Sequence, residues 1–87
     1  MRKDYEETKD FYDIILINKR ISELLLKEQE KLGLNQEQMA QKLDMPFQTY
    51  KRLSSPKNIC AINLINLVKI LKNSKITTHD VFSGIYD

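Results

Sequence analysis

The chain of 87 residues has room for one domain with a small core, and its 41% hydrophobic and 30% charged residues are typical of a folded globule. It contains two Gly and two Pro, and its longest apolar run is residues 14–17, so the composition excludes collagen-like, linker-rich and membrane-spanning architectures. No apolar segment follows the basic residues at its start, and we therefore expect no secretory signal and a cytoplasmic location.

The formal net charge of +2 hides an uneven distribution along the chain. Residues 1–13 carry five acidic and three basic side chains, a balance of −2, whereas residues 42–75 carry seven Lys or Arg and one acid, a balance of +6. This asymmetry indicates a face that binds a polyanion and an acidic end that avoids it. The alternative is that the lysines only solvate the surfaces of helices.

The first predicted element is a helix between residues 4 and 32, because this stretch contains neither Gly nor Pro. Its apolar residues recur at helical spacing: Ile14, Ile17, Ile21, Leu24, Leu25 and Leu32. Gly33 is expected to end this helix, since Gly readily adopts the left-handed conformation found at helix C-termini.

Two short helices joined by a tight turn are predicted next. Asn35 is expected to cap the first, residues 36–43, and Gln38 completes a capping box. Pro46 begins the second, residues 46–54, because a residue without an N–H suits the first helical turn. The small Ala40 allows the two helices to cross closely. The predicted inner side consists of Met39, Ala40, Leu43, Met45, Tyr50 and Leu53. The outer side of the second helix is left with Phe47, Gln48, Thr49, Lys51 and Arg52.

The remaining chain is predicted as a loop and two more helices. Residues 54–58 give the strongest loop signal of the sequence. The helix at residues 62–71 has apolar residues around most of its circumference, and we therefore expect it to be the buried centre of the domain. Thr77 or Thr78 is expected to cap a last short helix that contains Val81 and Phe82. The predicted fold class is all-α, with five helices and no sheet.

Side chains suited to catalysis or metal binding are few. Cys60 is the only Cys and His79 the only His, which excludes an intramolecular disulfide and supplies too few ligands for a zinc site of Cys and His. A Cys60–His79 dyad is one interpretation, but Cys60 lies in an apolar run, where a small buried thiol is expected. Gly33 and Gly84 are 51 positions apart, so no Gly-rich phosphate loop exists. We expect no enzyme, no metal and no cofactor.

Residues 34–43, LNQEQMAQKL, closely resemble the LSQEELAEKLG signature of Cro and phage-repressor type helix-turn-helix proteins, the XRE family. The similarity continues through MPFQTYKRL at residues 45–53, where that family has its turn and its recognition helix. Residues 62–71 resemble the family's fourth helix, and TTHDVF at residues 77–82 resembles its terminal SLDELF. The resemblance covers about residues 17–83 and implies a five-helix, lambda-repressor-like domain.

The second short helix has the residue types that read bases in a major groove. Gln48 can pair bidentately with adenine, Arg52 can pair with guanine or hold a phosphate, and Phe47 can press on a thymine methyl group. The resemblance places these three at the base-reading positions, with Thr49 and Lys51 beside them.

Three further residues are implied by the resemblance to contact the phosphate backbone. Gln36 occupies the helix-start position that anchors a phosphate, and Lys57 and Asn58 lie in the loop that touches the far backbone. Structural alternatives remain open at three positions. Gln36 can be a solvated polar residue, Arg52 can form a surface salt bridge, and Phe47 can pack on a neighbour.

The sequence departs from the family pattern at three places. Asp44 replaces the glycine of the turn, and Asp tolerates the left-handed conformation better than most residues. Residues 54–56, SSP, replace the ERG that follows the recognition helix, so the next loop is expected to differ. Glu28 stands where the family has a core Leu, which leaves the register of the first helix open.

Residues 1–16 form an N-terminal extension to the minimal domain of residues 17–87. Its apolar side consists of Tyr5, Phe11, Tyr12, Ile14, Ile15 and Leu16. Exposed patches of this kind often mark association surfaces, and DNA readers of this type dimerise on half-sites roughly 34 Å apart. We therefore expect a homodimer that forms through this extension. The alternative is that the extension packs on its own domain.

The leading hypothesis is a sequence-specific, double-stranded DNA-binding transcriptional regulator, a repressor, that reads the major groove with the helix at residues 46–54. The alternative is a protein-interaction module on the same fold, such as an antitoxin-like partner or a nuclease inhibitor. Salt-dependent binding to a duplex distinguishes the two.

Overall fold

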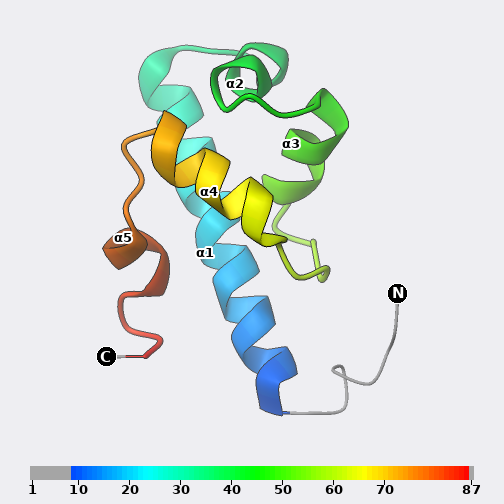
Figure 1. The fold of residues 1–87 in the computed structure, drawn as a ribbon, viewed down its shortest axis with the longest axis vertical. Helices are drawn as coiled ribbons and strands as arrows, with labels where there is room; N and C mark the ends of the chain where they lie inside the picture. The colour runs from blue at the N-terminus through cyan, green and yellow to red at the C-terminus, as the bar shows by residue number, and fades with distance from the viewer. Residues whose placement is uncertain (1–8, 87) are drawn as a thin grey trace.

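A computed structural model describes residues 9–86, and across this range the chain forms five helices and no strand. They are α1 (Lys9–Leu32), α2 (Gln36–Lys42), α3 (Phe47–Leu53), α4 (Leu64–Asn73) and α5 (Thr78–Phe82). Figure 1 shows α2, α3 and α4 gathered around the second half of α1, with α5 beside its middle, while the first turns of α1 reach past the other helices. The predicted all-α class is confirmed. Residues 4–8, expected to begin the first helix, lie outside the described residues.

The end of α1 and the start of α2 are fixed by local hydrogen bonds. Gly33 has φ 68°, and its N–H donates to the Glu30 carbonyl at 3.1 Å, while the Leu34 N–H donates to the Gln29 carbonyl at 3.1 Å. This pair of bonds satisfies carbonyls that the helix end would otherwise leave unpaired. Asn35 and Gln38 then form the predicted capping box, with N–H to side-chain distances of 2.8 and 2.9 Å.

The turn between α2 and α3 is built around the left-handed residue Asp44. Its φ is 59°, its N–H donates to the Gln41 carbonyl at 3.1 Å, and the Met45 N–H donates to the Ala40 carbonyl at 3.0 Å. The same bond pattern ends α1 at Gly33. Asp44 therefore adopts the left-handed conformation that a glycine usually supplies at a helix C-terminus. Pro46 is the residue before α3 and is extended, with φ −60° and ψ 148°; the helix begins one residue later than predicted.

The hydrophobic core takes residues from all five helices, and it includes all six residues predicted for the inner side of the short helices. Its members are Ile21, Leu25, Met39, Ala40, Leu43, Met45, Tyr50, Leu53, Ile70, Ile76 and Val81. Tyr50 is fully buried, and its hydroxyl donates to Gln29 Oε1 at 2.7 Å. A hydroxyl needs such a partner when it leaves water. Burial raises the pKa of Tyr50 to about 12.

The prediction that the fourth helix is the buried centre of the domain is wrong. Leu64, Ile65 and Val68 are 74%, 67% and 43% exposed, and only the opposite side, with Ile70 buried, meets the core. A chain this small has too few elements to surround a helix, and the central position belongs to α1. The helix also starts two residues later than predicted, because the Asn63 side chain accepts from the Asn66 N–H at 2.8 Å and caps it there.

Polar groups on α1 hold the C-terminal part of the chain. Glu28 accepts the Lys75 N–H at 3.0 Å, so this carboxylate of α1 has a defined partner. Arg20 Nη1 donates to the carbonyls of Asp80 and Ser83, both at 2.9 Å. Thr77 is the cap of α5, and hydrogen bonds from it lower the pKa of the Asp80 carboxyl.

Candidate nucleic-acid interface

The candidate interface is the outer face of α3. Tyr50 and Leu53 are buried on its inner side. Because they are three positions apart, they lie on one face, and their burial fixes the rotation of the helix about its axis. Gln48, Lys51 and Arg52 are consequently exposed together on the opposite side. The spacing i, i+3, i+4 places these three side chains on one surface, a mixed donor and acceptor set with two positive charges.

Phe47 and Gln36 lie side by side at the edge of this face. Both are half-buried and line one shallow surface hollow, together with Gln29, Asn35 and Glu37. Phe47 therefore faces the start of α2 at this hollow and is neither fully exposed nor fully buried. Thr49 is also half-buried, so it contributes less surface to this face than the exposed Gln48.

Lys57 and Asn58 lie in the loop that follows α3, and their side chains differ in exposure and in hydrogen bonding. The Lys57 side chain is exposed. Asn58 instead shapes the loop: its Oδ1 accepts the Cys60 N–H at 3.1 Å and its Nδ2 donates to the Cys60 carbonyl at 3.3 Å. A phosphate contact from Asn58 would therefore use the second Nδ2 hydrogen.

The loop is anchored by Asn18 of α1, a residue that no motif of the sequence identifies. Asn18 Nδ2 donates to the carbonyls of Asn58 and Cys60 at 3.0 and 3.1 Å. A signal was present, because Asn18 falls on the apolar face of α1 between Ile17 and Ile21. A polar residue at such a position needs a buried partner, although the sequence does not say which.

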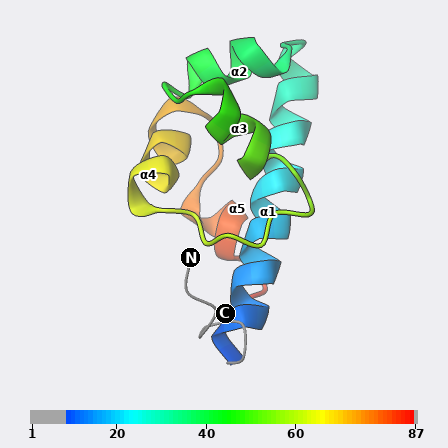
Figure 2. The same ribbon diagram turned by 90° about the vertical axis from the view of Figure 1, so that its right-hand side faces the viewer.

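The electrostatic character of this region follows from the absence of acids between Asp44 and Asp80 in the sequence. All of α3, its following loop and α4 lie in that interval, and their charged residues are Lys51, Arg52, Lys57, Lys69 and Lys72. The surface formed by α3, the following loop and α4 is therefore positive, because none of these three segments contains an acidic residue. Figure 2 shows α3 and α4 side by side on one flank of α1.

Residues 9–86 contain no group of three or more His, Cys, Asp or Glu side chains that could hold a metal ion. Cys60 is a free thiol that is half-buried, not fully buried as predicted, and His79 is exposed on α5. None of the helices described is both long and apolar enough to span a bilayer.

Comparison with protein-family models, curated proteins and solved structures gave no match to this chain. The resemblance to the XRE family therefore rests on the motif residues themselves.

Proposed function

We propose that the chain is a sequence-specific, double-stranded DNA-binding transcriptional regulator, a repressor of the Cro and phage-repressor type that acts in the cytoplasm. In this proposal α2, the Asp44 turn and α3 are the helix-turn-helix unit of a lambda-repressor-like domain. The observation that carries the proposal is the two-sided character of α3. One side is fully buried through Tyr50, and the other exposes Gln48, Lys51 and Arg52 together.

Base reading would come from the exposed side of α3 in the major groove. Gln48 offers the amide that pairs bidentately with adenine, and Arg52 offers the guanidinium fork that pairs with guanine or with a phosphate. The accessible part of Phe47 would contact a thymine methyl group. Lys51 and Thr49 would flank these contacts. The buried inner side anchors the short helix in the core, so the reading groups would be held in advance of binding.

Affinity would come from phosphate contacts at the two edges of α3. Gln36 lies at the start of α2 beside Phe47, and Lys57 lies in the loop after α3, so the two bracket the reading helix. Asn58 would add one amide hydrogen. Cations that neutralise phosphates release counterions, and this makes binding salt-dependent. These contacts would position the protein while the base contacts specify the sequence.

We also propose a homodimer, because a two-fold protein engages two half-sites of an operator. The described part of the N-terminal extension supports this: Tyr12 and Leu16, four residues apart on α1, are 72% and 52% exposed. Four apart on a helix places them on one side, where they would pair with the same residues of a second copy.

A protein-interaction module is the second candidate function. It is favoured by the exposed apolar side of α4, formed by Leu64, Ile65 and Val68, which a DNA contact would not use. In that case the duplex would be replaced by a protein partner, and α3 would have no sequence preference.

Selection of duplexes from a random pool tests the proposal. The expected result is enrichment of one pseudo-palindromic sequence whose half-sites are about 10 base pairs apart, or a multiple of that spacing. A pool that stays random after several rounds, with the protein folded throughout, would contradict the proposal and favour the interaction module.

A further inference from the structure

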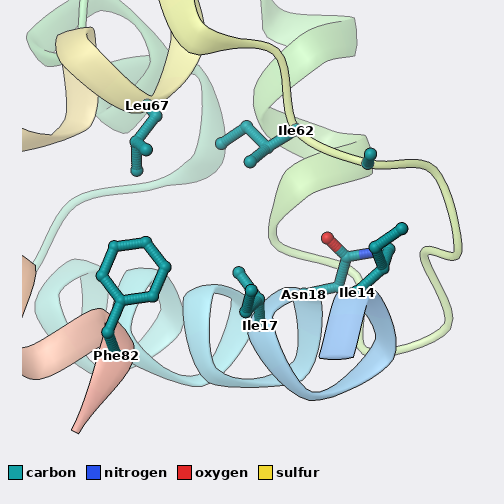
Figure 3. A pocket seen from close by; sticks show the side chains of 7 residues that line it. Ile14, Ile17, Asn18, Ile62, Leu67 and Phe82 are labelled. Atoms are coloured by element: carbon teal, nitrogen blue, oxygen red, sulfur yellow. The ribbon is translucent and has the colours of Figure 1, made fainter. Parts of the chain in front are cut away.

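A small apolar cavity lies between α1, α4, α5 and the segment that leads into α4. Its volume is about 160 Å³. Its apolar walls are the side chains of Ile14, Ile17, Ala61, Ile62, Leu67 and Phe82 (Figure 3). No charged residue lines it. The cavity is open to solvent on one side, and its volume has room for a molecule the size of benzene. It disfavours an ion because no charged group of its wall compensates the lost hydration.

Asn18 is the one residue with a polar side chain among those that line the cavity. Its side chain is 4% exposed, and its Nδ2 donates to two backbone carbonyls, those of Asn58 and Cys60. Carbonyl oxygens only accept, so the amide nitrogen must face the loop, and the amide oxygen is turned the other way. Figure 3 shows this oxygen pointing toward the space between Ile17 and Ile62. Within residues 9–86, the Asn18 hydrogen bonds use only the nitrogen.

We propose that this cavity binds a small neutral molecule with an apolar body and a single hydroxyl group, of the phenol class, and that Asn18 Oδ1 accepts the hydroxyl hydrogen. The apolar walls take the body of the ligand. Asn18 Oδ1, for which no hydrogen bond is seen within residues 9–86, gains one from the hydroxyl, which makes the hydroxyl the group that sets specificity.

The site is joined to the loop after α3 by one side chain. Asn18 holds this loop through Asn58 and Cys60, and the loop carries Lys57. A ligand on Oδ1 fixes the Asn18 side chain and keeps the loop in its described position. On the basis of the proposed DNA-binding function, the ligand therefore acts as a corepressor that raises affinity for the duplex, and the duplex raises affinity for the ligand equally.

The first test is binding of phenol to the whole chain without DNA, followed by ¹H–¹⁵N correlation spectra. We expect saturable shifts that include the Asn18 side-chain amide, and about fivefold weaker binding of benzene, which cannot donate to Oδ1. Asn18→Leu should make phenol and benzene equal. Because that variant also frees the loop, Leu67→Phe provides a second test: it fills the cavity from α4 and should abolish binding, whereas Ile65→Phe on the exposed side of the same helix should not.

Absence of saturable shifts, equal binding of benzene and phenol to the unmodified chain, or unchanged binding to Leu67→Phe would each overturn the site. The second test is duplex affinity with and without saturating phenol, where we expect an increase of about fivefold or more. Duplex binding that phenol leaves unchanged overturns the corepressor role. Phenol binding by a chain that binds no duplex upholds the cavity site and contradicts only the proposed function.

Discussion

Tyr50 of α3 donates its hydroxyl to Gln29 Oε1 of α1 across 2.7 Å. This bond joins the inner side of α3 to the central helix, at a residue that is fully buried. It therefore fixes both the depth and the rotation of α3, and through them the outward direction of Gln48 and Arg52 on the other side. The geometry of the candidate interface depends on this buried contact as much as on the exposed residues.

Removal of the Tyr50 hydroxyl should be visible as a loss of stability and as a change in its pH dependence. Tyr50→Phe leaves Gln29 Oε1 without its donor, and we expect the free energy of unfolding at pH 7 to fall by about 0.5–1.5 kcal/mol. Because burial raises the pKa of Tyr50 from 10.0 to about 12, the unfolded residue ionises first as the pH rises. Well below pH 10 Tyr50 is neutral in both states and contributes no slope.

Between pH 10 and 12 the free energy of unfolding of the unmodified chain should therefore fall by up to about 1.4 kcal/mol per pH unit from this group. Urea denaturation across this pH range measures the fall in the free energy of unfolding. Tyr50→Phe is the reference, because it retains all other titrating groups. Parallel curves for the two proteins would show that Tyr50 is not the source of the slope.

Enlargement of Ala40 should separate the two short helices. Ala40 is 2% exposed at the contact of α2 with α3, so Ala40→Leu has no space and we expect overpacking to cost about 1–3 kcal/mol. Gln41→Leu is the matched control, because the neighbouring residue of the same helix is exposed. Thermal unfolding compares the three proteins. An unchanged melting temperature for Ala40→Leu would mean that the helices do not cross there.

The left-handed conformation of Asp44 predicts opposite effects for two substitutions. Asp44→Gly should stabilise the chain slightly, by about 0.5 kcal/mol, because Gly adopts φ 59° without a steric cost. Asp44→Val should destabilise it by about 1–2 kcal/mol, because a β-branched residue is strained at positive φ. Denaturant titration of both variants and of the unmodified chain measures these changes in the free energy of unfolding. Equal effects of Gly and Val would contradict the role assigned to this turn.

The proposed dimer should depend on the exposed side of α1. Leu16→Glu places a charge beside its own symmetry mate, and we expect sedimentation velocity to show monomers at concentrations where the unmodified chain is dimeric. Ile65→Glu makes the same chemical change on α4 and should leave the dimer intact. If Ile65→Glu gives monomers and Leu16→Glu does not, the interface lies on α4 and the assignment to the extension is wrong.

The features that follow from local sequence were the predictable ones. Gly33, Asn35 and Gln38 fix helix ends through neighbours within five positions, and the structure has them as expected. The exposed side of α4 depends on how many elements surround it, which periodicity does not reveal, since Leu64 and Ile70 read alike as apolar. Asn18 lies 40 and 42 residues from the two carbonyls to which it donates, so its role required the tertiary structure.

Base-reading and phosphate-binding residues should respond differently to substitution. Gln48→Ala and Arg52→Ala should each reduce the preference for the selected duplex over a scrambled one by about 1–3 kcal/mol, because base edges carry sequence information. Lys57→Ala should weaken both complexes alike and lower the salt slope by about one unit. Fluorescence anisotropy on both duplexes measures these effects. A loss of preference in Lys57→Ala equal to that in Arg52→Ala would reverse their assigned roles.

The measurement that tests DNA binding most directly is titration of the unmodified chain with the selected and the scrambled duplex at two salt concentrations. The proposed function predicts affinity for the selected duplex about a thousandfold or more above that for the scrambled one, and weaker binding of both at the higher salt. No resolvable binding to either duplex at low salt, by protein whose circular dichroism shows it to be folded, would contradict it.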